Sequence, residues 1–220
     1  METVIIIILI AVFASLVALV SYYNRKREQK RSADISALAA GLGLSFSAAG
    51  DFPLLDRLSA LPLFKLGRSR VLSNLLAGET EEVRISIFDY CYTTGSGKQT
   101  HTTKLTIAAL ESPQLKIPAF TLRPESLFDK IGGLFGLQDI DFAEHPEFSS
   151  SFVLKGAEEE LIRKLFTRQL LDFFANRTGC CVEAFPGTMI YYLPGQRRKP
   201  EEFAKLLEEA YQVYGVIVDR

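Results

Sequence analysis

The chain is poor in the residues that most often carry chemistry. Its 220 residues include three cysteines, two histidines and no tryptophan. The cysteines show no C-x-x-C spacing, which excludes a zinc or redox motif of that kind, and they are too few for a disulfide-rich scaffold. Cys180 and Cys181 are adjacent, so in a strand they point to opposite faces, and we expect them to pack as small apolar side chains.

Neither sign of charge is in excess. The chain has 25 Lys and Arg residues against 26 Asp and Glu residues, and 48% of its residues are hydrophobic. This composition excludes a disordered or collagen-like chain. Nucleic acid is not expected as a partner, because the folded part has no basic excess and no aromatic-rich RNA motif.

The segment Gly95-Ser96-Gly97-Lys98 lacks the remaining parts of a phosphate-binding loop. That loop needs a glycine where this chain has Tyr92, and a serine or threonine where it has Gln99. It also needs a following helix, whereas residues 102–110 have the pattern of a strand. We therefore predict a hairpin turn here.

A long apolar run is present at the N-terminus. Residues Thr3 to Tyr23 form 21 consecutive positions without a charge. As a helix they extend about 30 Å, the thickness of the hydrocarbon core of a bilayer. Tyr22 and Tyr23 lie where an interfacial aromatic belt is expected. The run predicts a single transmembrane helix.

A basic cluster follows the apolar run instead of preceding it. A cleaved signal peptide, the alternative, carries its positive charges before the run. By the positive-inside rule, the N-terminus is outside and residues 24–220 lie in the cytoplasm, which makes this a single-pass protein of the inner (plasma) membrane. The same basic residues are candidates for binding anionic lipid headgroups: Arg25, Lys26, Arg27, Lys30 and Arg31.

Four regions follow from the composition: a transmembrane anchor at 1–23, a basic juxtamembrane linker at 24–32, a strand-rich subdomain at 33–132 and a helix-rich subdomain at 133–220. The last two could also form one domain. The order of elements predicts an α+β fold, with a mostly antiparallel sheet and flanking helices.

The spacing of apolar residues and the turn signals predict the individual elements. We expect one helix at 33–44, capped by Asp34, and a short second helix directly after Glu125. A third helix is expected at 157–175, with a break near Thr167, and a fourth at 200–214. Strands are expected at 63–66, 70–76, 116–122 and 152–154, and a second hairpin at 181–185 and 189–193.

The most distinct local pattern is a hairpin from Val83 to Leu110. With Ser96 and Gly97 at its centre, Asp89 faces Lys104 and Tyr92 faces His101, a register that the opposite charges favour. Near the base of this hairpin both faces carry apolar residues, so we expect cover on both sides and an exposed tip. Cys91 and His101 point to opposite faces in this register, which argues against a thiol–imidazole pair.

Two charged groups are candidate sites. Hard metal ions use oxygen ligands, and the densest acidic cluster consists of Asp139, Asp141, Glu144, His145 and Glu147. The favoured interpretation of Asp141 to Glu144 is a helix-capping box or a solvated loop. Arg68, Arg70 and Lys98 could together receive an anion if the ends of their strands converge, which the sequence leaves open.

Four segments carry a resemblance to a known family: FKLGRSRVLSNLLAGE (64–79), FDYCYTTGSGK (88–98), PAFTLRPE (118–125) and DIDFAEHPEF (139–148). In these the chain resembles a family of uncharacterised bacterial single-span membrane proteins with a cytoplasmic domain, most specifically in the FDY-x-Y-T-x-GSGK hairpin. The resemblance implies an anchor and one domain. It carries over no catalytic or binding residue.

The sequence therefore predicts a binding or scaffolding module at the membrane. No nucleophile–base pair, metal-ligand spacing or nucleotide loop stands out, and we predict no catalytic residue and no cofactor. The expected partners are the lipid bilayer and a membrane or cytoplasmic protein. The alternative is a membrane-associated enzyme, such as a hydrolase using the acidic cluster at 139–147.

Overall fold

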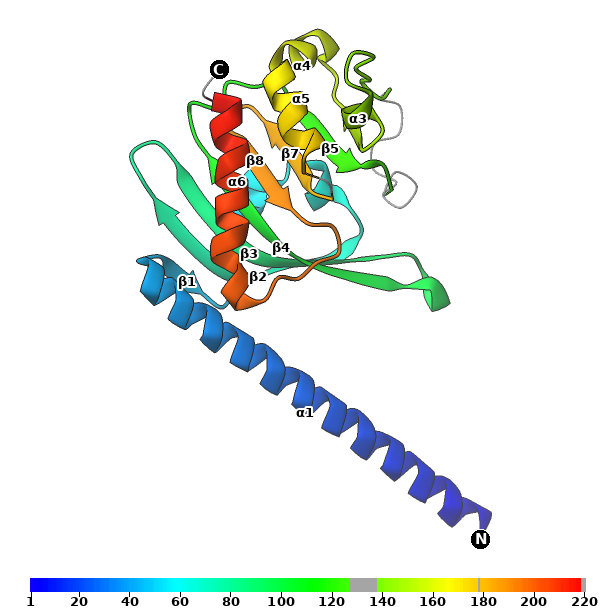
Figure 1. The fold of residues 1–220 in the computed structure, drawn as a ribbon. Coiled ribbons are helices and arrows are strands. Elements are labelled where there is room, and N and C mark those ends of the chain that lie inside the picture. The colour runs from blue at the N-terminus through cyan, green and yellow to red at the C-terminus, as the bar shows by residue number, and fades with distance from the viewer. Residues whose placement is uncertain (127–137, 178, 219–220) are drawn as a thin grey trace.

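A computed structural model describes residues 1–126, 138–177 and 179–218. A long N-terminal helix extends away from a sheet that is flanked by shorter helices (Figure 1). The α-helices are α1 (Glu2–Leu42), α2 (Phe52–Leu58), α3 (Pro146–Ser149), α4 (Glu159–Leu165), α5 (Arg168–Ala175) and α6 (Phe203–Val218). Within the described residues, three short 3-10 helices are present: η1 (Pro62–Lys65), η2 (Gly97–Gln99) and η4 (Pro200–Glu202).

One sheet of eight strands connects the whole domain. Its order is β1-β2-β3-β4-β8-β7-β5-β6, and every neighbouring pair is antiparallel. The strands are β1 (Ser45–Ser47), β2 (Arg68–Glu79), β3 (Arg84–Thr94), β4 (His101–Glu111), β5 (Phe120–Pro124), β6 (Phe152–Lys155), β7 (Cys181–Phe185) and β8 (Thr188–Tyr192). The predicted α+β class is confirmed. Because β4 pairs with β8, a single sheet extends through both predicted subdomains, 33–132 and 133–220.

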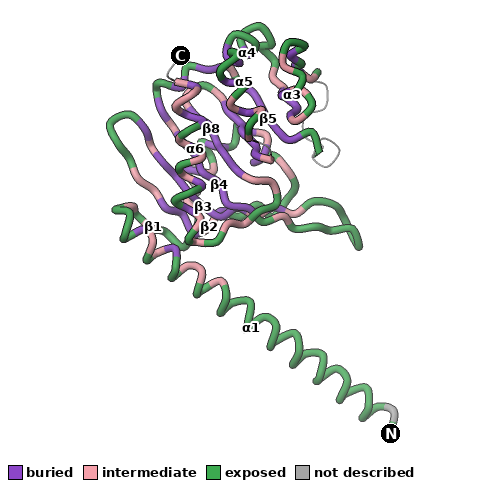
Figure 2. Tube along the Cα trace, viewed as in Figure 1, coloured by how far each residue is buried: buried purple, intermediate pink, exposed green. Residues whose placement is uncertain are grey.

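Both faces of the sheet are buried, as the hairpin pattern predicted. Ile87 and Ala108 point into a core shared with α6 and the C-terminal part of α1, whereas Phe88 and Ile107 point into a second core under α2 and η1. Burial concentrates in the sheet, and α1 is exposed along its N-terminal half (Figure 2). The period-two alternation of apolar residues explains both cores, since successive side chains of a strand face opposite sides.

The prediction of a separate helix starting at residue 33 was wrong, because the long helix α1 passes through this position without a break. No glycine or proline interrupts residues 24–34, and Arg, Lys, Glu and Gln are good helix formers, so the helix continues from the apolar run into the domain. Asp34 lies inside the helix and does not cap it. The helix ends before Gly43, which adopts the left-handed conformation (φ 68°) that glycine tolerates. Among the described residues, α1 alone is long and apolar enough to cross a membrane.

The register of the β3–β4 hairpin differs from the prediction by two residues. Asp89 pairs with Thr106, and Cys91 pairs with Lys104. The tip is a wider loop that contains η2, instead of a two-residue turn. A shift of two keeps every side chain on its predicted face, so Cys91 and His101 still point to opposite faces.

The C-terminal elements follow the predictions closely. Strands β6, β7 and β8 lie where they were expected, and the break near Thr167 separates α4 from α5. Two further expectations were wrong: η1 (Pro62–Lys65) lies where a strand was expected at 63–66, and β5 begins at Phe120 instead of residue 116. The helix expected after Glu125 lies largely outside the described residues.

Candidate functional site: a charged junction between the anchor helix and the sheet

A buried carboxylate on β3 receives two arginines from distant parts of the chain. The Asp89 side chain is 4% exposed. Arg31 of α1 donates to both of its oxygens, from Nε and Nη2, at 2.7 Å each. Arg197, in the loop between β8 and η4, donates from Nη2 at 2.9 Å and from Nε at 3.2 Å. Asp89 thus joins three elements that are far apart in the sequence.

Neutral side chains complete the shell around this carboxylate. Asn74 Nδ2 donates to it at 2.9 Å and Thr106 Oγ1 at 3.0 Å. Asn74 lies in an irregularity of the β2–β3 pairing and has a positive φ of 52°, a conformation that asparagine tolerates better than most residues. Ser32 of α1 donates in turn to Asn74 Oδ1.

Glu28 of α1 provides a second carboxylate, which extends the network toward the N-terminal half of α1. Glu28 accepts two hydrogen bonds of 2.6 Å from Arg197, and Lys104 of β4 lies 3.4 Å from the same carboxylate. We call the set Glu28, Arg31, Asn74, Asp89, Thr106 and Arg197 the Asp89 junction. The loop that carries Arg197 is itself held by Thr106, whose N–H donates to Gln196 O at 3.1 Å and whose Oγ1 accepts from Arg198 N at 3.0 Å.

Both carboxylates of the Asp89 junction are stabilised in the ionised form. Burial alone raises the pKa of Asp89, but the hydrogen bonds from Arg31 and the positive charge of Arg197 outweigh it, and the pKa lies below its usual value. The hydrogen bonds from Arg197 likewise lower the pKa of Glu28. The ion pairs therefore persist at neutral pH.

A cavity of about 330 Å³ borders the junction. Its lining includes Ser73, Cys91 and Lys104 beside the junction residues. The charged groups in this lining, on Glu28, Asp89, Lys104 and Arg197, are already in ion pairs with one another or with Arg31. Three cations, Arg31, Lys104 and Arg197, share two carboxylates, so one positive charge is in excess, and these pairs fix α1 against the sheet.

A second buried ion pair lies under the other face of the sheet. Glu183 of β7 is fully buried and accepts from Arg123 at 2.7 Å, from the Tyr192 hydroxyl at 2.9 Å and from the Leu63 N–H at 2.8 Å. These contacts tie β5, β7 and β8 to η1. The three donors converge on one buried carboxylate inside the fold, which indicates a structural role, although Arg123 Nε is buried without a hydrogen-bond partner among the described residues.

The five basic residues predicted to contact lipid headgroups differ in their surroundings. Arg25, Lys26, Arg27 and Lys30 are exposed on α1. Arg31 is half-buried and is held by Asp89, so its charge is already paired inside the protein.

The acidic cluster at 139–147 does not converge on a site. Asp139 accepts from Leu154 N at 2.8 Å, and burial raises its pKa. His145 Nδ1 lies 3.6 Å from Asp172. Within the described residues, no three His, Cys, Asp or Glu side chains are placed to share a metal ion. Of the two favoured interpretations of Asp141 to Glu144, the capping box was wrong, because α3 begins only at Pro146 with His145 as its N-cap, and these residues lie in a loop.

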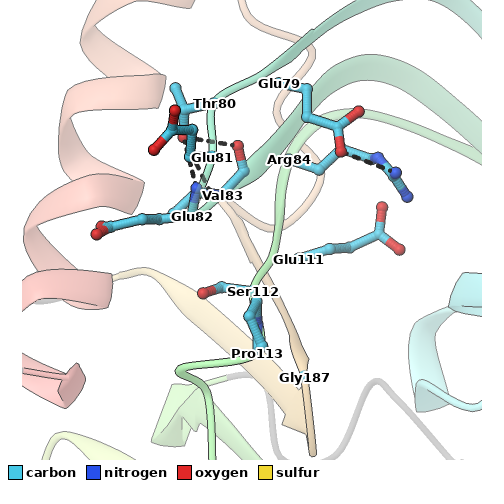
Figure 3. Close-up of a pocket in the computed structure, with 10 residues that line it drawn as sticks. All are labelled: Glu79, Thr80, Glu81, Glu82, Val83, Arg84, Glu111, Ser112, Pro113 and Gly187. Carbon is cyan, nitrogen blue, oxygen red and sulfur yellow. Dashed lines mark hydrogen bonds and ion pairs between the residues drawn. The ribbon is translucent and has the colours of Figure 1, made fainter.

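The two ends of the β2–β4 region carry opposite charge, and only the residues of the basic end stood out as a candidate site in the sequence. A cavity of about 290 Å³ is lined by Glu79, Glu81 and Glu82 at the β2–β3 turn and by Glu111 at the end of β4, and Arg84 pairs there with Glu79 at 3.0 Å (Figure 3). At the other end, Arg68 donates to Gly95 O in the β3–β4 tip. The start of β2 and this tip thus lie together, which brings Arg68, Arg70 and Lys98 to the same end of the sheet.

Comparison with known proteins shows a likeness in structure. No protein-family model and no curated protein matches the chain. The chain is similar to the crystal structure of the mycobacterial trehalose monomycolate transport factor A, TtfA, with a TM-score of 0.60 and 12% sequence identity. The match covers 84% of this chain and 95% of that chain. At this identity the likeness establishes a shared fold alone.

Proposed function

We propose that the chain is a single-pass inner-membrane protein, with its N-terminus outside and its domain in the cytoplasm, and that this domain serves as a binding or scaffolding module at the membrane. The apolar run at residues 3–23 and the basic residues that follow it support the orientation. The partner we propose is another protein of the same membrane.

The observation that carries the proposal is the continuity of α1. Its 41 residues extend about 60 Å, and the apolar half and the half that packs on the sheet belong to one helix. Arg31 and Glu28 then fasten that helix to Asp89 and Arg197. A module joined in this way keeps a defined orientation to the membrane plane, which a scaffold for a membrane partner requires.

The structural likeness supports an accessory role. TtfA is described as a transport factor, and we propose that this chain likewise assists a membrane process without performing chemistry of its own. The enzyme alternative loses its main support because the acids at 139–147 lie beside β6, whereas His101 and Arg68 lie at the opposite side of the sheet.

The test is photo-crosslinking of the full-length chain in intact membranes. A photoreactive amino acid replaces Leu161, a large apolar side chain that remains exposed outside α1. We expect capture of one specific membrane protein, and equal capture by a variant whose acids at 139–147 are changed to amides. A partner lost with those acids, or a C-terminal reporter active only outside the cytoplasm, would contradict the proposal.

A further inference from the structure

Charge is segregated along the β2–β4 region. Residues 65–78 and 90–110 contain no Asp or Glu, and their basic residues are Lys65, Arg68, Arg70, Lys98 and Lys104. We call the exposed part of this end, residues 68–71 and 94–102, the basic tip. The opposite end carries the four glutamates of the cavity in Figure 3. The region thus has a basic end and an acidic end.

The contacts of α1 show which end faces the membrane anchor. Asp89 of β3 contacts Arg31, whereas Lys104, two residues nearer the tip on the paired strand, contacts Glu28. Residues nearer the tip of the β3–β4 hairpin therefore contact residues of α1 that lie nearer its apolar half. Figure 1 agrees, because the β3–β4 hairpin extends to the side toward which the N-terminus of α1 runs.

The basic tip also extends as far along α1 as the end of the apolar run. From Lys104 to His101 the strand advances about 10 Å, at about 3.3 Å per residue. From Glu28 to Tyr23, where the apolar run ends, α1 advances about 7.5 Å. The hairpin and the helix start from the same contact and extend toward the same side in Figure 1, so a membrane span of α1 places the tip near the level of Tyr23.

We propose that the basic tip is a second membrane contact that binds anionic phospholipid headgroups. This inference rests on the proposed membrane span of α1. The tip is built from small polar residues with Lys98 and His101, and it has no large apolar side chain except Val71 at its edge. It therefore fits a headgroup layer, where basic side chains attract anionic lipids, and not the hydrocarbon core. Together with Arg25, Lys26, Arg27 and Lys30 it gives the domain a two-point attachment.

The test uses full-length protein in vesicles of phosphatidylcholine with or without phosphatidylglycerol, in which a fraction of the lipids carries a headgroup quencher. A fluorophore is attached to S96C in a Cys91→Ser background, or to E81C at the acidic end as the matched control. We expect quenching of the tip fluorophore with phosphatidylglycerol, weak quenching without it, and little quenching at position 81 in either vesicle.

Charge removal completes the test. Arg70→Gln with Lys98→Gln should abolish the extra quenching that phosphatidylglycerol causes, whereas Glu79→Gln with Glu82→Gln should leave it unchanged. Equal quenching at positions 96 and 81, or quenching that does not depend on phosphatidylglycerol, would contradict the proposed contact between the basic tip and anionic headgroups. Alkaline extraction of the same vesicles tests the span separately: release of the protein contradicts the proposed function, while retention without tip quenching contradicts the tip contact alone.

Discussion

Arg31 of α1 holds both oxygens of Asp89 on β3 with two hydrogen bonds of 2.7 Å, across 58 positions of sequence. Such bidentate, charge-assisted pairs are the stronger kind of hydrogen bond and fix the orientation of both partners. The pair is the most direct link between the anchor helix and the sheet.

Removing one partner of this pair should destabilise the protein strongly. Asp89→Asn leaves Arg31 without its buried counter-charge, whereas Arg197 keeps its pair with Glu28, and losses of about 3–5 kcal/mol are typical of breaking a buried pair. Denaturant unfolding of the full-length protein in detergent micelles measures the effect. Arg84→Gln is the control, because its pair with Glu79 is exposed and contributes at most about 1 kcal/mol. Similar losses for the two variants would contradict the assigned role of the junction.

The contribution of Asp89 to the free energy of unfolding should disappear in acid. The pKa of Asp89 is lowered in the folded state, so the ionised form is stabilised by folding, and the stability it confers is complete above its unfolded pKa of about 3.9. As the pH falls through the lower folded pKa, that stability is lost. We expect the difference in unfolding free energy between wild type and Asp89→Asn to stay constant between about pH 7 and about pH 5 and to shrink below about pH 4. A difference that grows on acidification would contradict the ionised pairing.

Breaking α1 should free the domain from a fixed orientation. Gln29 is exposed in the middle of the helix, and proline there costs about 3 kcal/mol of helix stability. In a Cys91→Ser background, spin labels at Leu19→Cys and Glu81→Cys should give one narrow distance distribution in the parent protein. Gln29→Pro should broaden it, and Gln29→Ala should not. A broad distribution in the parent would contradict a rigid connection.

The register of the β3–β4 hairpin can be tested by disulfide formation. Thr93 pairs with Thr102, and their hydroxyl oxygens lie 3.1 Å apart. Thr93→Cys with Thr102→Cys should therefore oxidise readily to an intramolecular disulfide, detected by a mobility shift without reductant. The matched pair Thr93→Cys with Thr100→Cys, which belongs to a register two residues away, should react slowly. The reverse order of rates would contradict the observed register.

The three native thiols should differ in reactivity. Cys180 and Cys181 are buried, and burial raises the pKa of Cys180 to about 11, so few of these thiols are ionised at neutral pH. Cys91 is half-buried and lines the cavity beside the Asp89 junction. Maleimide labelling followed by mass spectrometry should modify Cys91 first. Faster labelling of Cys180 would show that its surroundings open in solution.

Local sequence patterns predicted many of the elements, because their causes are local. Alternating apolar residues placed Ile87 and Phe88 on opposite, buried faces, and the predicted break near Thr167 separates α4 from α5. The hairpin register was wrong because the turn was centred on Ser96 and Gly97, which set Asp89 opposite Lys104, whereas the tip is a wider loop that contains η2. The true partners, Arg31 and Arg197, lie far away in sequence, and no local pattern indicates them.

The sequence by itself determined the apolar run, the basic cluster after it, the alternation of the strands and the absence of familiar catalytic motifs. These follow from composition and from the periods of helices and strands, which each segment carries alone. Only the tertiary structure decided that α1 continues into the domain and is held by Asp89, and that the basic and acidic ends of the β2–β4 region lie at opposite ends. The reason is physical: ion pairs and strand pairings between distant residues depend on how the chain folds back on itself, and their energies are realised only when all the partners are in place.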